Sequence, residues 1–133
     1  MSRLTIFLAR SLGLFMVLLV AGLLIRGGAA IQASVTDGPV MFSYAITSLA
    51  IGVAMVVGHN VWGAGTLPLV VTLVGWLILA KGLVLLVLQP ASLQVALDRM
   101  HYAEHYPGFL APALLIGLYL VWAGFTAKTD AGR

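Results

Sequence analysis

The stretch VGHNVWGAGTLPLVVTLVGWLILAKG, residues 57–82, decides the fold class. Its second half continues as an apolar run to Leu88, and a helix of roughly 20 apolar residues crosses about 30 Å of hydrocarbon. Lipid offers no partner for open backbone groups, so the spanning form must be helical. The stretch therefore predicts a transmembrane helix, preceded by a turn that carries His59, Asn60 and Trp62.

The composition of the whole chain indicates a membrane protein. The 133 residues are 62% hydrophobic and 8% charged, and the mean hydropathy is +1.10. Soluble domains have about 25% charged residues. The absence of cysteine excludes disulfides and thiolate metal sites. Seven basic residues, which give a net charge of +3, are too few and too scattered for a nucleic-acid-binding surface.

Four apolar segments predict an all-α transmembrane four-helix bundle, as a single domain over residues 1–133. The expected helices cover residues 10–31, 40–58, 66–88 and 108–126, and residues 33–39 are expected to form a loop. Pro39, Pro68 and Pro107 stand near the starts of the later three helices, where a missing N–H costs little. The first segment resembles a secretory signal, but Arg10 interrupts its apolar run, which favours a spanning helix.

Residues 92–105, SLQVALDRMHYAEH, predict a short amphipathic helix on the membrane surface between the third and fourth spans. Asp98, His101 and His105 fall toward one polar side of this helix. Two histidines at i and i+4 can share zinc or copper. The spacing matches no established metal signature, so a hydrated polar face is the simpler interpretation.

The distribution of Lys and Arg predicts that both termini are cytoplasmic in a bacterial inner membrane. Four spans place both termini and the 58–65 connection on one side of the membrane. That side carries Arg3, Arg10, Lys128 and Arg133. The opposite loops carry Arg26 and Arg99 beside acidic residues, namely Asp37, Asp98 and Glu104.

Glycines spaced seven apart predict close helix packing. Gly75 and Gly82 form one such pair, and Gly117 and Gly124 form another. A separation of seven returns to the same helical face, and small residues there let a neighbouring backbone approach. The neighbour can be another helix of the chain or a partner protein.

The polar residues in the quoted stretch each have a functional and a structural interpretation. His59 and Asn60 can cap the end of the second helix and fix the turn, while a membrane histidine can also bind haem or relay protons. Trp62 is typical of the interfacial aromatic belt. Trp76 lies deeper, as an expected packing anchor, with Thr72 or a backbone carbonyl as the expected partner of its N–H.

Lys81 is the one charge expected well inside a span. Its Cα lies roughly 10 Å from the helix end at about 1.5 Å per residue. Its stem can extend toward the interface, or its ammonium can pair with an acid on the same side. Asp37 is the first candidate partner, because its loop begins the neighbouring second helix. Capture of a lipid phosphate is compatible with either arrangement.

The pattern His59-Asn60-Val61-Trp62, then Thr72-Leu73-Val74-Gly75-Trp76, then Lys81-Gly82 resembles a group of small uncharacterised bacterial integral membrane proteins. In that group H-N-x-W precedes T-x-x-G-W and K-G. The resemblance implies a four-helix inner-membrane protein whose patterned residues belong to one structural unit. It implies no activity.

These observations favour a non-enzymatic accessory or scaffold protein, surrounded by membrane lipids and packed against itself or a larger membrane complex. No Asp or Glu lies within an expected span, and no hydrolase or kinase motif is present. No cofactor is therefore expected. The first alternative is a small oligomeric transporter or channel with a polar path at Lys81 and His59. The second is a haem- or metal-binding subunit that uses His59 or the His101–His105 pair.

Overall fold

The computed structural model describes residues 1–128, which form helices without any strand. The helices are α1 (Arg3–Arg26), α2 (Gly28–Val35), α3 (Gly38–Gly58), α4 (Thr66–Val87), α5 (Pro90–Arg99) and α6 (Tyr102–Thr126). Four of them, α1, α3, α4 and α6, are long and apolar enough to cross a membrane. The predicted all-α four-helix class is confirmed, and the chain is a multi-pass membrane protein.

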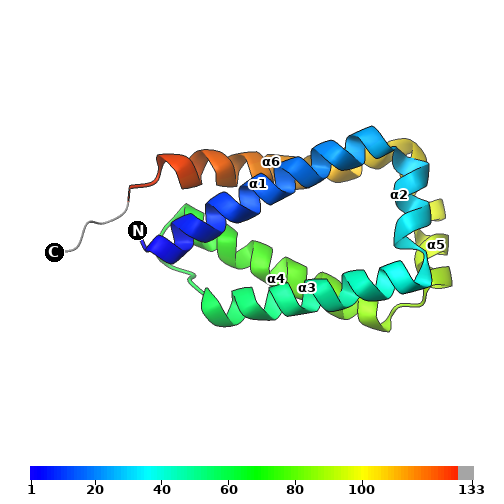
Figure 1. Ribbon diagram of the computed structural model, residues 1–133, viewed down its shortest axis with the longest axis horizontal. Helices are drawn as coiled ribbons and strands as arrows, with labels where there is room; N and C mark the ends of the chain where they lie inside the picture. Colours follow the sequence, from blue (N-terminus) through cyan, green and yellow to red (C-terminus); the bar gives the residue numbers. More distant parts are fainter. Residues whose placement is uncertain (129–133) are drawn as a thin grey trace.

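The four long helices form two tightly packed pairs, α1 with α6 and α3 with α4. The pairs meet near the start of α1 and the end of α6 and diverge toward the opposite end, where α2 and α5 lie across the molecule (Figure 1). We call the space between the inner sides of the diverging pairs the V. The contact between the two pairs is made mainly by α4, which touches both α1 and α6. α3 scarcely touches either of them.

The hydrophobic core lies where the two pairs meet. Its members come from α1, α3, α4 and α6, and are Ala9, Met55, Leu67, Val71, Val74, Leu120 and Ala123. Outside this core, large apolar side chains remain uncovered: Ile25 is 88% exposed and Val87 is 83% exposed. Water would solvate such a surface poorly, so the surrounding medium of these helices is lipid.

The first predicted helix differs from the structure at both ends. α1 begins at Arg3 rather than at residue 10, because Ser2 caps it by accepting a hydrogen bond from the Thr5 N–H. The helix does not continue to residue 31. Gly27 breaks it with a φ of 87°, a conformation that favours glycine. Residues 28–35 form α2 instead, so the predicted loop begins only after Val35.

The predicted surface helix over residues 92–105 is also wrong at its end. α5 ends at Arg99, and His101 adopts the left-handed conformation with φ 50°. Residues from Tyr102 onward belong to α6, which therefore starts six residues earlier than the predicted residue 108. Pro107 lies inside α6 and leaves the Ala103 carbonyl without its helical donor. Gly28 packs directly against this carbonyl, where a Cβ would have no room.

Candidate functional site

The polar residues of the quoted stretch gather at the turn between α3 and α4. His59 ends α3, and its backbone N–H donates to the Met55 carbonyl over 2.7 Å. Its ring is buried, and Nε2 lies 3.4 Å from the carbonyl oxygen of Pro68 in α4, which requires Nε2 to carry the proton. His59 therefore joins the end of one helix to the first turn of the next.

Asn60 links the two tryptophans of the pattern. Its Oδ1 accepts hydrogen bonds from Trp62 Nε1 at 2.7 Å and from Trp76 Nε1 at 3.4 Å. Helical side chains lean toward the N-terminus of their helix, so the ring of Trp76 reaches back to the turn. The expected partners of Trp76, Thr72 or a backbone carbonyl, are wrong, because Thr72 is engaged elsewhere.

Thr72 binds the backbone of the turn. Its hydroxyl accepts a hydrogen bond from the Val61 N–H at 3.0 Å and donates one to the Val61 carbonyl at 3.1 Å. The side chain is 1% exposed. A single buried hydroxyl thus satisfies both backbone groups of a residue that has no helical partner, which fixes the path of the turn.

The α3–α4 pair is held together along its length by glycines. A Cβ at Gly75 would lie 3.0 Å from Met55 Cβ, and one at Gly82 would lie 2.7 Å from the backbone nitrogen of Leu49. The sequence did not single out Gly52, where a Cβ would meet the Leu79 backbone at 2.5 Å. The predicted close packing at Gly75 and Gly82 therefore occurs within the chain.

The α1–α6 pair uses the same device. Gly117 packs against Met16 and Val17, and Gly124 packs against the segment that contains Arg10. Gly13, which is not part of a seven-residue glycine pair, also faces the backbone of α6.

Arg10 fixes the end of α6. Its Nε donates to the Gly124 carbonyl over 2.8 Å, and its guanidinium lies 4.9 Å from the centre of the Phe125 ring. A cation beside the last carbonyls of a helix is favourable. The residue that interrupts the first apolar run is therefore a cap for the last helix.

The predicted pair of Lys81 and Asp37 does not form. Asp37 caps α3, where its Oδ1 accepts a hydrogen bond from the Val40 N–H at 3.2 Å. Gly82 packs beside Leu49, so Lys81 lies near the level of Leu49 on α3. Twelve residues separate Leu49 from Asp37, which is about 18 Å along a helix. That distance exceeds the reach of a lysine side chain.

The residues proposed for metal binding do not form a site with three protein ligands. Asp98 Oδ1 accepts hydrogen bonds from Gln32 at 2.6 Å and from Gln94 at 3.0 Å. His105 Nδ1 lies 3.2 Å from the His101 carbonyl, and the two imidazole rings stand 6.5 Å apart between centres. Within residues 1–128, no group of three or more His, Asp or Glu side chains could hold a metal ion.

The contacts at the α3–α4 turn give the patterned residues one structural role. Each of His59, Asn60, Trp76 and Thr72 is joined by a hydrogen bond to a residue across the turn or to the neighbouring helix. Over the described part of the chain, every buried side-chain nitrogen and oxygen has a hydrogen-bond partner. These hydrogen bonds fix the α3–α4 helical hairpin. Lys81 is the one polar residue of the H-N-x-W, T-x-x-G-W and K-G pattern that takes no part in them.

Comparison with protein families, with curated proteins and with solved structures gives no match to this chain. The resemblance to small bacterial membrane proteins with the H-N-x-W, T-x-x-G-W and K-G pattern therefore stays a prediction.

Proposed function

We propose that the chain is a non-enzymatic accessory protein of the bacterial inner membrane. It acts as a scaffold subunit that packs against a second copy or against a larger membrane complex. One observation carries this proposal: no buried polar side-chain atom in residues 1–128 lacks a partner within the chain. Catalytic and transport sites usually keep polar groups available for a substrate, and this interior commits its polar groups to holding two helix pairs.

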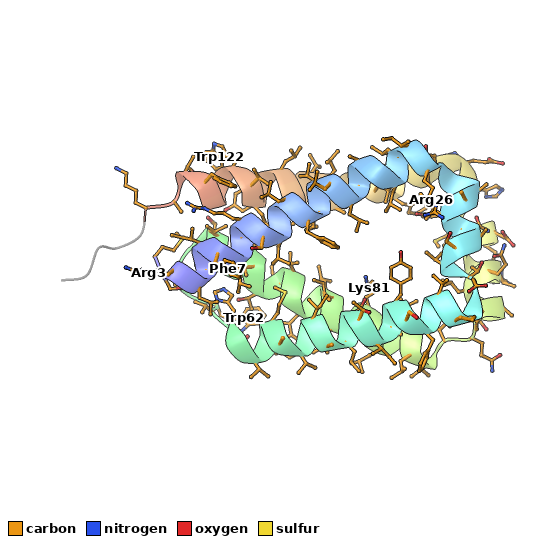
Figure 2. The ribbon with its side chains drawn as sticks, in the orientation of Figure 1. Arg3, Phe7, Arg26, Trp62, Lys81 and Trp122 are labelled. Atoms are coloured by element: carbon orange, nitrogen blue, oxygen red, sulfur yellow. The ribbon has the colours of Figure 1, made fainter. Side chains whose placement is uncertain are left out.

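The proposed partner protein binds the outer, apolar surface of the helix pairs. Gly75, Gly82, Gly117 and Gly124 are all covered by helices of the same chain, so they cannot also receive a neighbouring protein. The outer side of the α1–α6 pair exposes large side chains instead, among them Phe7 and Trp122, which are 64% and 66% exposed (Figure 2). Aromatic residues are enriched where proteins meet.

The proposed topology places both termini in the cytoplasm. Arg3 begins α1 and Lys128 follows the end of α6 by two residues, and both of these helix ends lie at the narrow end of the molecule (Figure 1). Arg133, which contributed to the prediction, is outside the described residues. The positive-inside tendency supports this orientation, and the turn that contains Trp62 then lies on the same side.

The two alternatives gain no support from the geometry of one chain. A polar path between Lys81 and His59 would have to pass the apolar core at Val71 and Val74, which are 0% and 5% exposed. A haem or metal site at His59 would require its Nε2 to leave the Pro68 carbonyl.

The test of the proposed function is a native pull-down. The chain, expressed at its natural level with a C-terminal tag, is extracted in mild detergent and its companions are identified by mass spectrometry. A stoichiometric membrane protein or a stable homo-oligomer is expected. A lone monomer, without any companion in both mild detergent and lipid nanodiscs, contradicts the proposal.

A further inference from the structure

Two cations near the wide end of the V have no protein partner. Lys81 lies in α4, six residues before its last residue, and Arg26 is the last residue of α1. Neither side chain forms a hydrogen bond or an ion pair with any residue of the described 1–128. An unpaired charge at membrane depth is costly and usually marks a binding function.

Lys81 lies on the face of α4 that packs into the hydrophobic core nearer the start of the helix. Leu67, Val71, Val74 and Ile78 follow one another at helical spacing and pack into the core between the two pairs. Lys81 is the next residue on that face, three after Ile78. At its level the pairs have separated, and Figure 2 shows its side chain on the inner side of the V.

Arg26 reaches the same space from the opposite pair. It lies two heptads after Leu12, which packs against the core, so both residues belong to nearly the same face of α1. Figure 2 places Arg26 at the wide end, beside the start of α2. One cation is therefore supplied by each helix pair.

The acidic residues at the wide end of the V do not pair with Lys81 or Arg26. Asp37 caps α3, and Asp98 accepts hydrogen bonds from Gln32 and Gln94. Glu104 is exposed in the first turn of α6, where the helix dipole favours a negative charge. No acid of the described chain forms an ion pair with Lys81 or Arg26, so both cations are available to an anion from outside the chain.

We propose that the V binds one anionic phospholipid, with its phosphate between Lys81 and Arg26 and an acyl chain along the apolar inner sides of α1 and α4. Between the cations and the core, the inner sides of α1 and α4 carry apolar side chains such as Leu12 and Ile78, which match acyl chains better than a soluble anion. Lys81 lies about 9 Å from the end of α4, so its extended stem brings the ammonium toward phosphate level. Charge-assisted bonds to phosphate from Lys and Arg are strong and specific. This inference does not depend on the accessory role.

The test is native mass spectrometry of the full chain after delipidation in detergent, titrated with phosphatidylglycerol or with phosphatidylcholine. Wild type is expected to retain one phosphatidylglycerol and to bind phosphatidylcholine more weakly. Lys81→Met, which keeps the length of the side chain, should weaken phosphatidylglycerol binding by about tenfold. Arg26→Gln should weaken it as well, whereas Arg99→Gln, an exposed arginine at the same end on α5, should not.

A thermal shift measured on the same proteins separates binding from folding. Phosphatidylglycerol should raise the melting temperature of wild type more than phosphatidylcholine does. For Lys81→Met the two lipids should act equally, and its melting temperature without lipid should stay near that of wild type, which shows that it folds. Equal phosphatidylglycerol binding by wild type and Lys81→Met overturns the proposal. So does a lipid-free dimer or complex that fills the V, an outcome that would leave the accessory role standing.

Discussion

Two side chains make most of the hydrogen bonds that fix the α3–α4 turn. Thr72 holds both backbone groups of Val61, and Asn60 receives both neighbouring indole N–H groups. Thr72 is buried, so the Val61 groups that face its hydroxyl would lose a hydrogen-bond partner at a point that water reaches poorly. The turn should therefore be sensitive to the removal of one hydroxyl.

Thr72→Val keeps the shape of the side chain but removes its hydroxyl. We expect the free energy of unfolding in mild detergent to fall by about 1–2 kcal/mol, because the Val61 N–H and carbonyl lose their partners. Unfolding in increasing denaturing detergent, followed by circular dichroism, measures this change. The matched control is Thr47→Val, since Thr47 is exposed on α3 and forms no hydrogen bond within residues 1–128. Equal stability of the two variants would contradict the role of Thr72.

At this scale the sequence identified which residues matter but not how they pair. The H-N-x-W and T-x-x-G-W residues do contact one another, yet the partner of Trp76 is Asn60 rather than Thr72. That choice depends on how the connection from His59 to Gly65 folds back on α4, which no local pattern encodes. The Lys81–Asp37 pair was predicted wrongly for a related reason. The prediction used the fact that α3 and α4 are neighbours in the chain, whereas the distance depends on the register in which the two helices pack.

The helices pack in pairs through glycines that fit against backbone. Register within the α3–α4 pair is set where Gly52 meets Leu79 and Gly82 meets Leu49. Such contacts cannot yield without separating the helix axes, because the obstructing atoms are backbone.

Gly52→Ala should destabilise the chain by about 1–3 kcal/mol. The added Cβ would lie 2.5 Å from the Leu79 backbone, so α3 and α4 would have to move apart. Gly22→Ala is the control, because nothing lies within 4 Å of the corresponding position on α1. It should be neutral or stabilising, since alanine favours helix over glycine. Thermal unfolding in one detergent compares them, and a loss for Gly22→Ala equal to that for Gly52→Ala would refute the explanation.

The sequence predicted the presence of the four spanning helices, but it did not predict all of their ends. Hydropathy located the four spans, and the bounds of α3 and α4 differ from the predicted ranges only at their Gly38 and Val87 ends. The break at Gly27 and the left-handed turn at His101 were missed. Glycine is common in membrane helices, and positive φ is uncommon for any other residue type, so neither residue signals its conformation alone.

Over the whole molecule, the two pairs diverge around the V, with the start of α1 and the end of α6 at the narrow end and α2 and α5 across the wide end (Figure 1). This arrangement puts the α3–α4 turn and the α5 helix on opposite sides of the membrane. The chain has no cysteine, so single introduced thiols report this topology without further changes.

Ala64→Cys and Ala91→Cys place thiols at exposed positions in the turn and on α5. With intact spheroplasts, a membrane-impermeant maleimide should label Ala91→Cys only, because the proposed orientation puts the α3–α4 turn in the cytoplasm. Ala64→Cys should react after the membrane is opened. Phe15→Cys, on the lipid-facing side of α1, should stay unlabelled in both conditions. The reverse pattern would invert the proposed orientation, and labelling of both from one side would contradict the four spans.

The pairing of the first long helix with the last one determines how this protein can be made. α3 and α4 leave the ribosome in succession and can join at once, but Gly13 of α1 must wait for Gly117 of α6. Roughly a hundred residues of translation separate them, which takes about 5–20 s at typical synthesis rates. During that delay the nascent N-terminal segment remains in the bilayer with its glycine face unmatched. Until the C-terminal span arrives, that face of α1 can contact only lipid or the finished α3–α4 hairpin.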